Sequence, residues 1–76
     1  MSTQREARAV LRKRIEGLRT IGAYAVQVES GRAFGSRGAV IVAWVPKHFA
    51  GRLPATVSAT VRGKKVVVPV RTMEAP

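Results

Sequence analysis

The fold is decided by residues 39–45, which read Ala-Val-Ile-Val-Ala-Trp-Val and are apolar throughout. A strand with one face in water alternates apolar and polar residues, so this uninterrupted run predicts a central strand that is covered on both faces. Its β-branched content favours a strand over a buried helix. We expect the strand to end at Pro46, because proline lacks a backbone N–H donor and restricts the residue before it.

Three further strands are predicted around this centre. Residues 22–29 alternate between apolar and polar positions and predict a half-buried strand. Residues 56–62 alternate in the same way, and a tight turn then leads into a hairpin partner over 65–70. Pro69 cannot donate a hydrogen bond to a ladder, so this last strand is predicted to lie at an edge of the sheet. Residues 72–76 are predicted to form a tail.

The N-terminal residues 3–19 predict an amphipathic helix. Ser2 or Thr3 is placed to cap it, and Glu6 follows Thr3 by the three residues that a capping box requires. Apolar residues then recur at helical spacing and predict a core-facing stripe, with Val10 at its margin. The stripe consists of Ala7, Leu11, Ile15 and Leu18.

The order of one helix and four strands with short connections predicts an α+β fold. We expect one N-terminal amphipathic helix packed on a three- to four-stranded, mostly antiparallel sheet. The 76 residues allow a single domain, residues 1–76. A domain of this size buries only about 60% of the surface that its unfolded chain exposes. Its stability is therefore expected to be marginal, or to be shared with a partner or within a homo-oligomer.

The charge balance is the strongest functional signal. The chain has 14 Lys and Arg against four acids, all of them Glu, and a net charge of +10 at pH 7. Such a protein is attracted to polyanions, of which nucleic acid is the first candidate and an anionic membrane surface the second. The alternative explanation is a GC-rich genome, whose codons favour Arg and Ala.

Four arginines fall in a narrow sector of the predicted helix when residues are placed about 100° apart. We call this set the arginine ridge; its members are Arg5, Arg8, Arg12 and Arg19. Lys13 lies elsewhere on the helix, and Arg14 lies on the opposite side of the apolar stripe. The ridge is suited to follow a phosphate backbone; the alternative is a solvated face whose Arg stems cover the edge of the core.

Cations outside the helix are predicted to assist the ridge. Residues 30–38 form a loop rich in Gly and Arg, in which arginines can reach phosphates and Phe34 can stack on a base. The alternative is an ordinary hairpin loop without a ligand. Two lysines lie at the tip of the predicted hairpin. The four helper residues are Arg32, Arg37, Lys64 and Lys65.

No catalytic, cofactor or metal site is predicted. His48 is the one histidine, and the chain contains no Asp, Asn or Cys. A Ser-His-acid triad would have to combine His48 with scattered Ser and Glu residues, and no local motif supports this. One His and four Glu are a poor ligand set for zinc. We therefore expect a protein that is not an enzyme and uses no cofactor.

The expected location is the cytoplasm, in a bacterial or phage setting. The N-terminus lacks the apolar segment of a secretory signal. The longest apolar run, residues 38–45, is far shorter than a membrane span. The helix has an amphipathic pattern, but its apolar face lacks Trp and Phe and is needed to cover the sheet, so we expect no membrane partner.

Three short stretches resemble a known family. They are Val42-Ala-Trp-Val45, Leu53-Pro-Ala-Thr-Val57 and Gly63-Lys-Lys-Val-Val-Val-Pro-Val70. Together they resemble the small domain that precedes trypsin-like peptidase domains in some bacterial proteins. In that domain a helix leads into two strands, a Leu-Pro turn and a final strand opened by Gly-x-x-Val. The resemblance covers most of residues 5–71 and departs at 21–31, where the family is richer in Gly-Val pairs. It implies an accessory interaction domain and supplies no catalytic residues.

Two functional hypotheses follow from the sequence. The first is a non-enzymatic polyanion-binding module that binds the backbone of DNA or RNA with weak sequence specificity. The second is a protein-interaction or structural module, such as an accessory domain, a small phage-type structural subunit or an inhibitor of a larger machine. A small core and an edge strand favour the second hypothesis, because both invite a protein partner.

Overall fold

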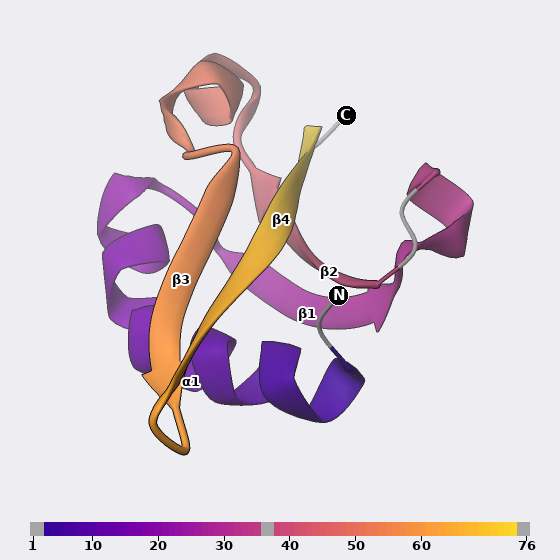
Figure 1. The fold of residues 1–76 in the computed structure, drawn as a ribbon. Coiled ribbons are helices and arrows are strands. Elements are labelled where there is room, and N and C mark those ends of the chain that lie inside the picture. The colour runs from indigo at the N-terminus through magenta and orange to yellow at the C-terminus, as the bar shows by residue number, and fades with distance from the viewer. Residues whose placement is uncertain (1–2, 36–37, 75–76) are drawn as a thin grey trace.

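One helix packs on one four-stranded sheet, which confirms the predicted α+β fold (Figure 1). The computed structural model describes residues 3–35 and 38–74, without the side chains of residues 33, 34 and 48–50. The elements, with η marking a 3-10 helix, are α1 (Gln4–Ile21), β1 (Ala25–Ser30), η1 (Gly31–Phe34), β2 (Ala39–Val45), η2 (Lys47–Arg52), β3 (Thr56–Val61) and β4 (Lys64–Glu74).

Both ends of α1 are fixed by the local sequence. Thr3 caps the helix: its Oγ1 accepts from the Glu6 N–H at 3.1 Å, and its own N–H donates to Glu6 Oε1 at 3.0 Å. The predicted capping box is therefore confirmed. At the other end, Gly22 adopts φ 127° and donates its N–H to the Arg19 carbonyl at 3.0 Å. This backbone conformation favours glycine, so the helix ends where the sequence permits it.

The core lies between α1 and the sheet. Ala7 and Leu18 are buried, as the predicted stripe requires, and Leu11 packs against the same cluster. Val10 is also fully buried, so its predicted position at the margin of the stripe is wrong. α1 contacts all four strands and thereby closes one face of the sheet.

The strands lie in the order β1-β2-β4-β3. β1 pairs with β2 and β3 with β4 in antiparallel fashion, whereas β2 and β4 run parallel. β2 is central, as predicted, and is buried along its length except at the half-buried Trp44. Ala39, Ile41, Ala43 and Val45 join the core under α1, while Val40 and Val42, which alternate with them, are also buried. The strand is therefore covered on both faces.

β4 is an interior strand, so its predicted position at the edge is wrong. Its first half pairs with β3, and its second half pairs with β2 from Val70 onward. Pro69 lies opposite Thr56, immediately before the first residue that pairs with β2. Its missing N–H therefore falls where β4 changes partner, a position that the sequence rule for proline in strands does not distinguish from an edge.

The C-terminal strand is longer than the sequence predicts. β4 continues to Glu74, and residues 72–74 pair with Ala43, Trp44 and Val45 of β2. The tail predicted over residues 72–76 is therefore wrong for its first three residues, and residues 75 and 76 lie outside the described part of the chain.

The predicted 30–38 loop contains the short helix η1, and the Gly31 N–H donates to the Gly38 carbonyl at 3.0 Å across the base of the loop.

Candidate nucleic-acid interface

The arginine ridge lies on the exposed side of α1. Arg5, Arg8, Arg12 and Arg19 are all exposed, whereas Ala7, Val10 and Leu18 are buried on the other side of the helix. With a rise of about 1.5 Å per residue, the ridge extends along about 21 Å of the helix axis. One duplex strand carries a phosphate about every 3.4 Å of its axis, so this length spans roughly six phosphates.

Most of the ridge charge is not compensated. Arg19 Nη1 lies 3.8 Å from Glu16 Oε1, but both side chains are largely exposed, and such pairs contribute little to stability. Among residues 3–35 and 38–74, Arg5, Arg8 and Arg12 have no hydrogen-bond or ion-pair partner. The guanidinium groups of these three residues are accordingly available to an external anion.

Two other cations of α1 have a structural contact instead. Arg14 Nε donates to the Ser58 carbonyl at 2.7 Å, and Lys13 Nζ donates to the Thr60 carbonyl. β3 is an edge strand, and alternate carbonyls along its outer side have no strand to bind. Lys13 and Arg14 therefore cover an edge that would otherwise be open to another strand. Arg14 already differs from the ridge in the sequence, because it lies on the opposite side of the apolar stripe.

The β3–β4 hairpin turns on Arg62 and Gly63. Val61 pairs with Lys64, which leaves a two-residue loop, and the φ angles are 53° at Arg62 and 77° at Gly63. Two-residue hairpin loops with positive φ at both positions strongly favour Asn-Gly or Gly-Gly. Arg62 is thus an unfavourable residue for this turn. The sequence predicts Arg62 both as the last residue of the preceding strand and as the first residue of the tight turn, but it did not indicate Arg62 as a site residue.

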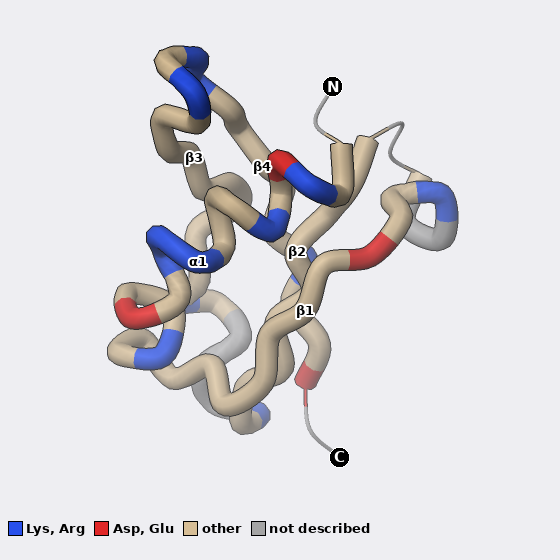
Figure 2. Tube along the Cα trace, turned by 90° about the horizontal axis from the view of Figure 1, so that it is seen from below, with Lys and Arg blue, Asp and Glu red and all other residues tan. Residues whose placement is uncertain are grey.

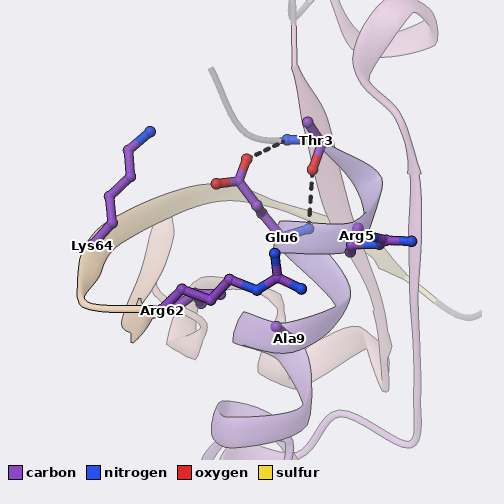
Figure 3. A pocket seen from close by; sticks show the side chains of 7 residues that line it. Thr3, Arg5, Glu6, Ala9, Arg62 and Lys64 are labelled. Carbon is purple, nitrogen blue, oxygen red and sulfur yellow. Dashed lines mark hydrogen bonds between the residues drawn. The ribbon is translucent and has the colours of Figure 1, made fainter.

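The turn and the start of α1 enclose a pocket of about 620 Å³ (Figure 3). The helix contributes Arg5, Glu6 and Ala9 next to Thr3, and the hairpin contributes Val61, Arg62 and Lys64. Figure 3 shows Arg62 extending from the turn toward the helix, while Glu6 lies between the two elements. Arg5 and Lys64, which the sequence predicted as separate contributors, therefore border one cavity together with Arg62.

Glu6 is the one acid of this pocket. The pKa of its carboxyl lies below its ordinary value of 4.5, first because Thr3 donates a backbone N–H to the carboxylate, and also because the Lys64 cation is near. Desolvation acts in the opposite direction. Glu6 is therefore ionised at neutral pH, and three cations and one carboxylate border the pocket.

Two of the remaining predicted residues, Lys65 and Arg32, lie apart from this pocket. Lys65 is exposed. Neighbouring residues of a strand point to opposite faces of the sheet, so Lys65 points to the face opposite the one that carries Lys64 and its partner Val61. Arg32 is exposed on η1, which lies far from the β3–β4 turn in both views (Figures 1 and 2). Arg37 lies outside the described residues. The predicted site is thus divided into the ridge, the pocket and separate outlying cations.

The described residues contain no group of three or more His, Cys, Asp or Glu side chains that could hold a metal ion. No charged or polar residue is buried among them. The side chain of His48 lies outside the described residues. In the described part of the chain, no helix has both the length and the apolar character needed to cross a membrane.

Comparison with protein-family models, curated proteins and solved structures finds no match for this chain. The resemblance to an accessory domain therefore stays a prediction.

Proposed function

We propose that the protein binds the sugar-phosphate backbone of nucleic acid and that the arginine ridge is the main contact. The observation that carries the proposal is the exposed row of Arg5, Arg8 and Arg12, which have no partner among the described residues. A phosphate bound by an arginine replaces condensed counterions, and their release favours binding at low salt. The net charge of +10 adds a long-range attraction to any polyanion.

The distribution of the cations supports this function over a compositional origin of the charge. Codon bias would scatter arginines without regard to the fold. In α1 they are divided: Lys13 and Arg14 bind β3 carbonyls, while the ridge residues are exposed on the outer side of the helix. Figure 2 shows Lys and Arg along α1 and at the β3–β4 turn, with few acidic positions near them.

Weak sequence specificity follows from the kind of contact. Phosphate contacts fix the position of a protein on nucleic acid but do not distinguish bases. Base readout needs an element that enters a groove with side chains matched to base edges. We propose backbone binding to DNA or RNA in the cytoplasm, with Arg32, Arg37 and Lys65 as helper residues.

Fluorescence anisotropy of labelled single-stranded DNA, duplex DNA and RNA tests the proposal at about 50 and 200 mM salt. A protein with several phosphate contacts loses orders of magnitude in affinity over this range. Tight binding with a steep salt dependence supports the proposal. Absence of binding at the lower salt concentration overturns it.

A second candidate function, a protein-interaction or structural module, is favoured by the sheet face opposite α1. Val67 and Met73 are 49% and 42% exposed, and the half-buried Trp44 lies opposite Met73 in the β2–β4 pairing. Contiguous exposed apolar residues are typical of contact surfaces, and Trp44 and Met73 are neighbours on this face. A discrete oligomer in size-exclusion chromatography, combined with no retention on heparin, would favour this function over the first.

A further inference from the structure

The pocket between α1 and the β3–β4 turn has the composition of a phosphate site. Its cations come from two elements: Arg5 from the first turn of α1, and Arg62 and Lys64 from the hairpin. Ala9 and Val61 give it an apolar wall. We propose that this pocket binds a nucleotide through its phosphomonoester, presented either at the end of a nucleic acid strand or on a free nucleotide. The strand-end form rests on the proposed function, because Arg5 belongs to both the ridge and the pocket.

The charge of the pocket matches a phosphomonoester better than a backbone phosphate. Three cations and the Glu6 carboxylate leave an excess of two positive charges. A phosphomonoester carries a charge of about −1.5 to −2 at pH 7, whereas each backbone phosphodiester carries a single charge. The guanidinium group of Arg62, which extends toward α1 in Figure 3, supplies a planar pair of donors that suits two oxygens of one phosphate.

The shape of the pocket also favours a terminal phosphate. Its volume of about 620 Å³ lies within the range of pockets that hold small molecules, roughly 300 to 1,000 Å³. A terminal phosphate is linked to the chain on one side only, so it can enter a recess between a helix and a turn. The wall of Ala9 and Val61 is suited to contact the attached sugar or base.

The backbone at Arg62 gives an independent reason to assign it a ligand. Its φ of 53° favours Asn or Gly, and the side chain has no hydrogen-bond or ion-pair partner among the described residues. Arginine therefore improves neither the turn nor any contact that the structure describes. Its side chain does extend toward α1, where its guanidinium would bind the phosphate, while Lys64 borders the same pocket from the other end of the turn (Figure 3).

The critical variant is Arg62→Asn, which removes a pocket cation and installs a residue that the turn prefers. Lys47→Asn is the matched control, because Lys47 is exposed, lies outside the pocket and carries the same charge. Lys64→Gln is a second pocket variant that leaves the turn residues unchanged. Circular dichroism and thermal unfolding show that each variant is folded before binding is measured.

Titration with adenosine 5′-monophosphate, followed by NMR or calorimetry, tests the pocket without a strand. We expect wild type and Lys47→Asn to bind the nucleotide and to ignore adenosine. Arg62→Asn and Lys64→Gln should each weaken nucleotide binding about tenfold, the effect of losing one charge-assisted hydrogen bond. Equal binding by all four proteins overturns the proposal, as does tighter binding of a phosphoserine peptide than of the nucleotide.

Oligonucleotides of one sequence, with a 5′-phosphate or a 5′-hydroxyl, distinguish the two sources. A strand-end site predicts about tenfold tighter binding of the phosphorylated strand by wild type, lost in Arg62→Asn. Nucleotide binding without this preference assigns the pocket to free nucleotides. If no oligonucleotide binds but the nucleotide does, the proposed function is wrong and the proposed phosphate site is supported. If oligonucleotides bind equally with a 5′-phosphate and a 5′-hydroxyl and the nucleotide does not bind, the proposed phosphate site is wrong and the proposed function is supported.

Discussion

Arg8 and Arg12 lie on the outer side of α1, whereas Lys13 and Arg14 reach the edge of β3. All four are exposed cations on one helix, yet only the second pair has partners in the described structure. The first pair is available to an anion, and the second pair satisfies backbone carbonyls of Ser58 and Thr60. Charge alone therefore does not assign a function to a residue, because the geometry of its neighbours decides what the charge binds.

The largest expected effect is on binding by the outer pair. Arg8→Gln/Arg12→Gln should weaken nucleic acid binding about a hundredfold at 50 mM salt and lower the slope of log K against log salt by about two. The free energy of unfolding should stay within about 0.5 kcal/mol of wild type, as is usual for surface substitutions. Anisotropy and urea unfolding measure the two quantities. Unchanged affinity would show that the ridge is not the contact.

The matched double variant Lys13→Gln/Arg14→Gln removes the same charge from the other pair. It should lower the free energy of unfolding by about 1 to 2 kcal/mol, because two carbonyls lose their donors, while most of the affinity and salt slope persist. Its uncovered β3 edge should also promote self-association, which analytical ultracentrifugation detects. If both double variants lose affinity equally, net charge governs binding and the contrast between the two pairs is wrong.

A smaller effect on stability is expected at the hairpin turn. Arg62→Asn should raise the free energy of unfolding by up to about 1 kcal/mol, since positive φ is unfavourable for most residues and tolerated by Asn. Urea unfolding of Arg62→Asn, with Lys47→Asn as the control, measures this change in the free energy of unfolding. A loss of stability would mean that the Arg62 side chain makes a stabilising contact, as the Arg14 side chain does with the Ser58 carbonyl.

The smallest effect concerns Glu6. Its pKa in the folded protein is lowered from 4.5, so its stabilising contribution is present above about pH 4.5 and is lost as the pH falls through the folded-state pKa. Glu6→Gln keeps a capping side chain but does not titrate. Wild type should therefore be the more stable of the two at pH 7, and the difference should shrink at pH 3. A constant difference in unfolding free energy would contradict this linkage.

The sequence was most informative where structure depends on near neighbours. Thr3 and Glu6 lie three residues apart and identify the start of α1, and the apolar run 39–45 identifies the central strand. Pro69 was misinterpreted because its missing donor is compatible both with an edge and with the point where β4 changes partner. That choice depends on pairing with β2, which no local pattern encodes.

The candidate site likewise has one part that depends on near neighbours in the sequence and one part that depends on tertiary packing. The ridge could be predicted, because helical spacing alone places Arg5, Arg8 and Arg12 together. The pocket could not, because Arg5 and Arg62 are distant in sequence and line one pocket only because the hairpin packs beside α1. The positive φ of Arg62 could not be predicted from the sequence either, because the rules for hairpin turns expect Asn or Gly at that position.

The change of partner along β4 has a consequence for the order of folding. Val61 and Lys64 are near neighbours in the chain, so the β3–β4 hairpin closes a short loop and can form within microseconds. Pairing Ile41 with Val70 closes a much longer loop, whose entropic cost delays the parallel ladder. We therefore expect the hairpin to belong to the folding nucleus and residues 72–74 to join late. Changes at the turn should then alter mainly the refolding rate, and changes in the last residues of β4 mainly the unfolding rate.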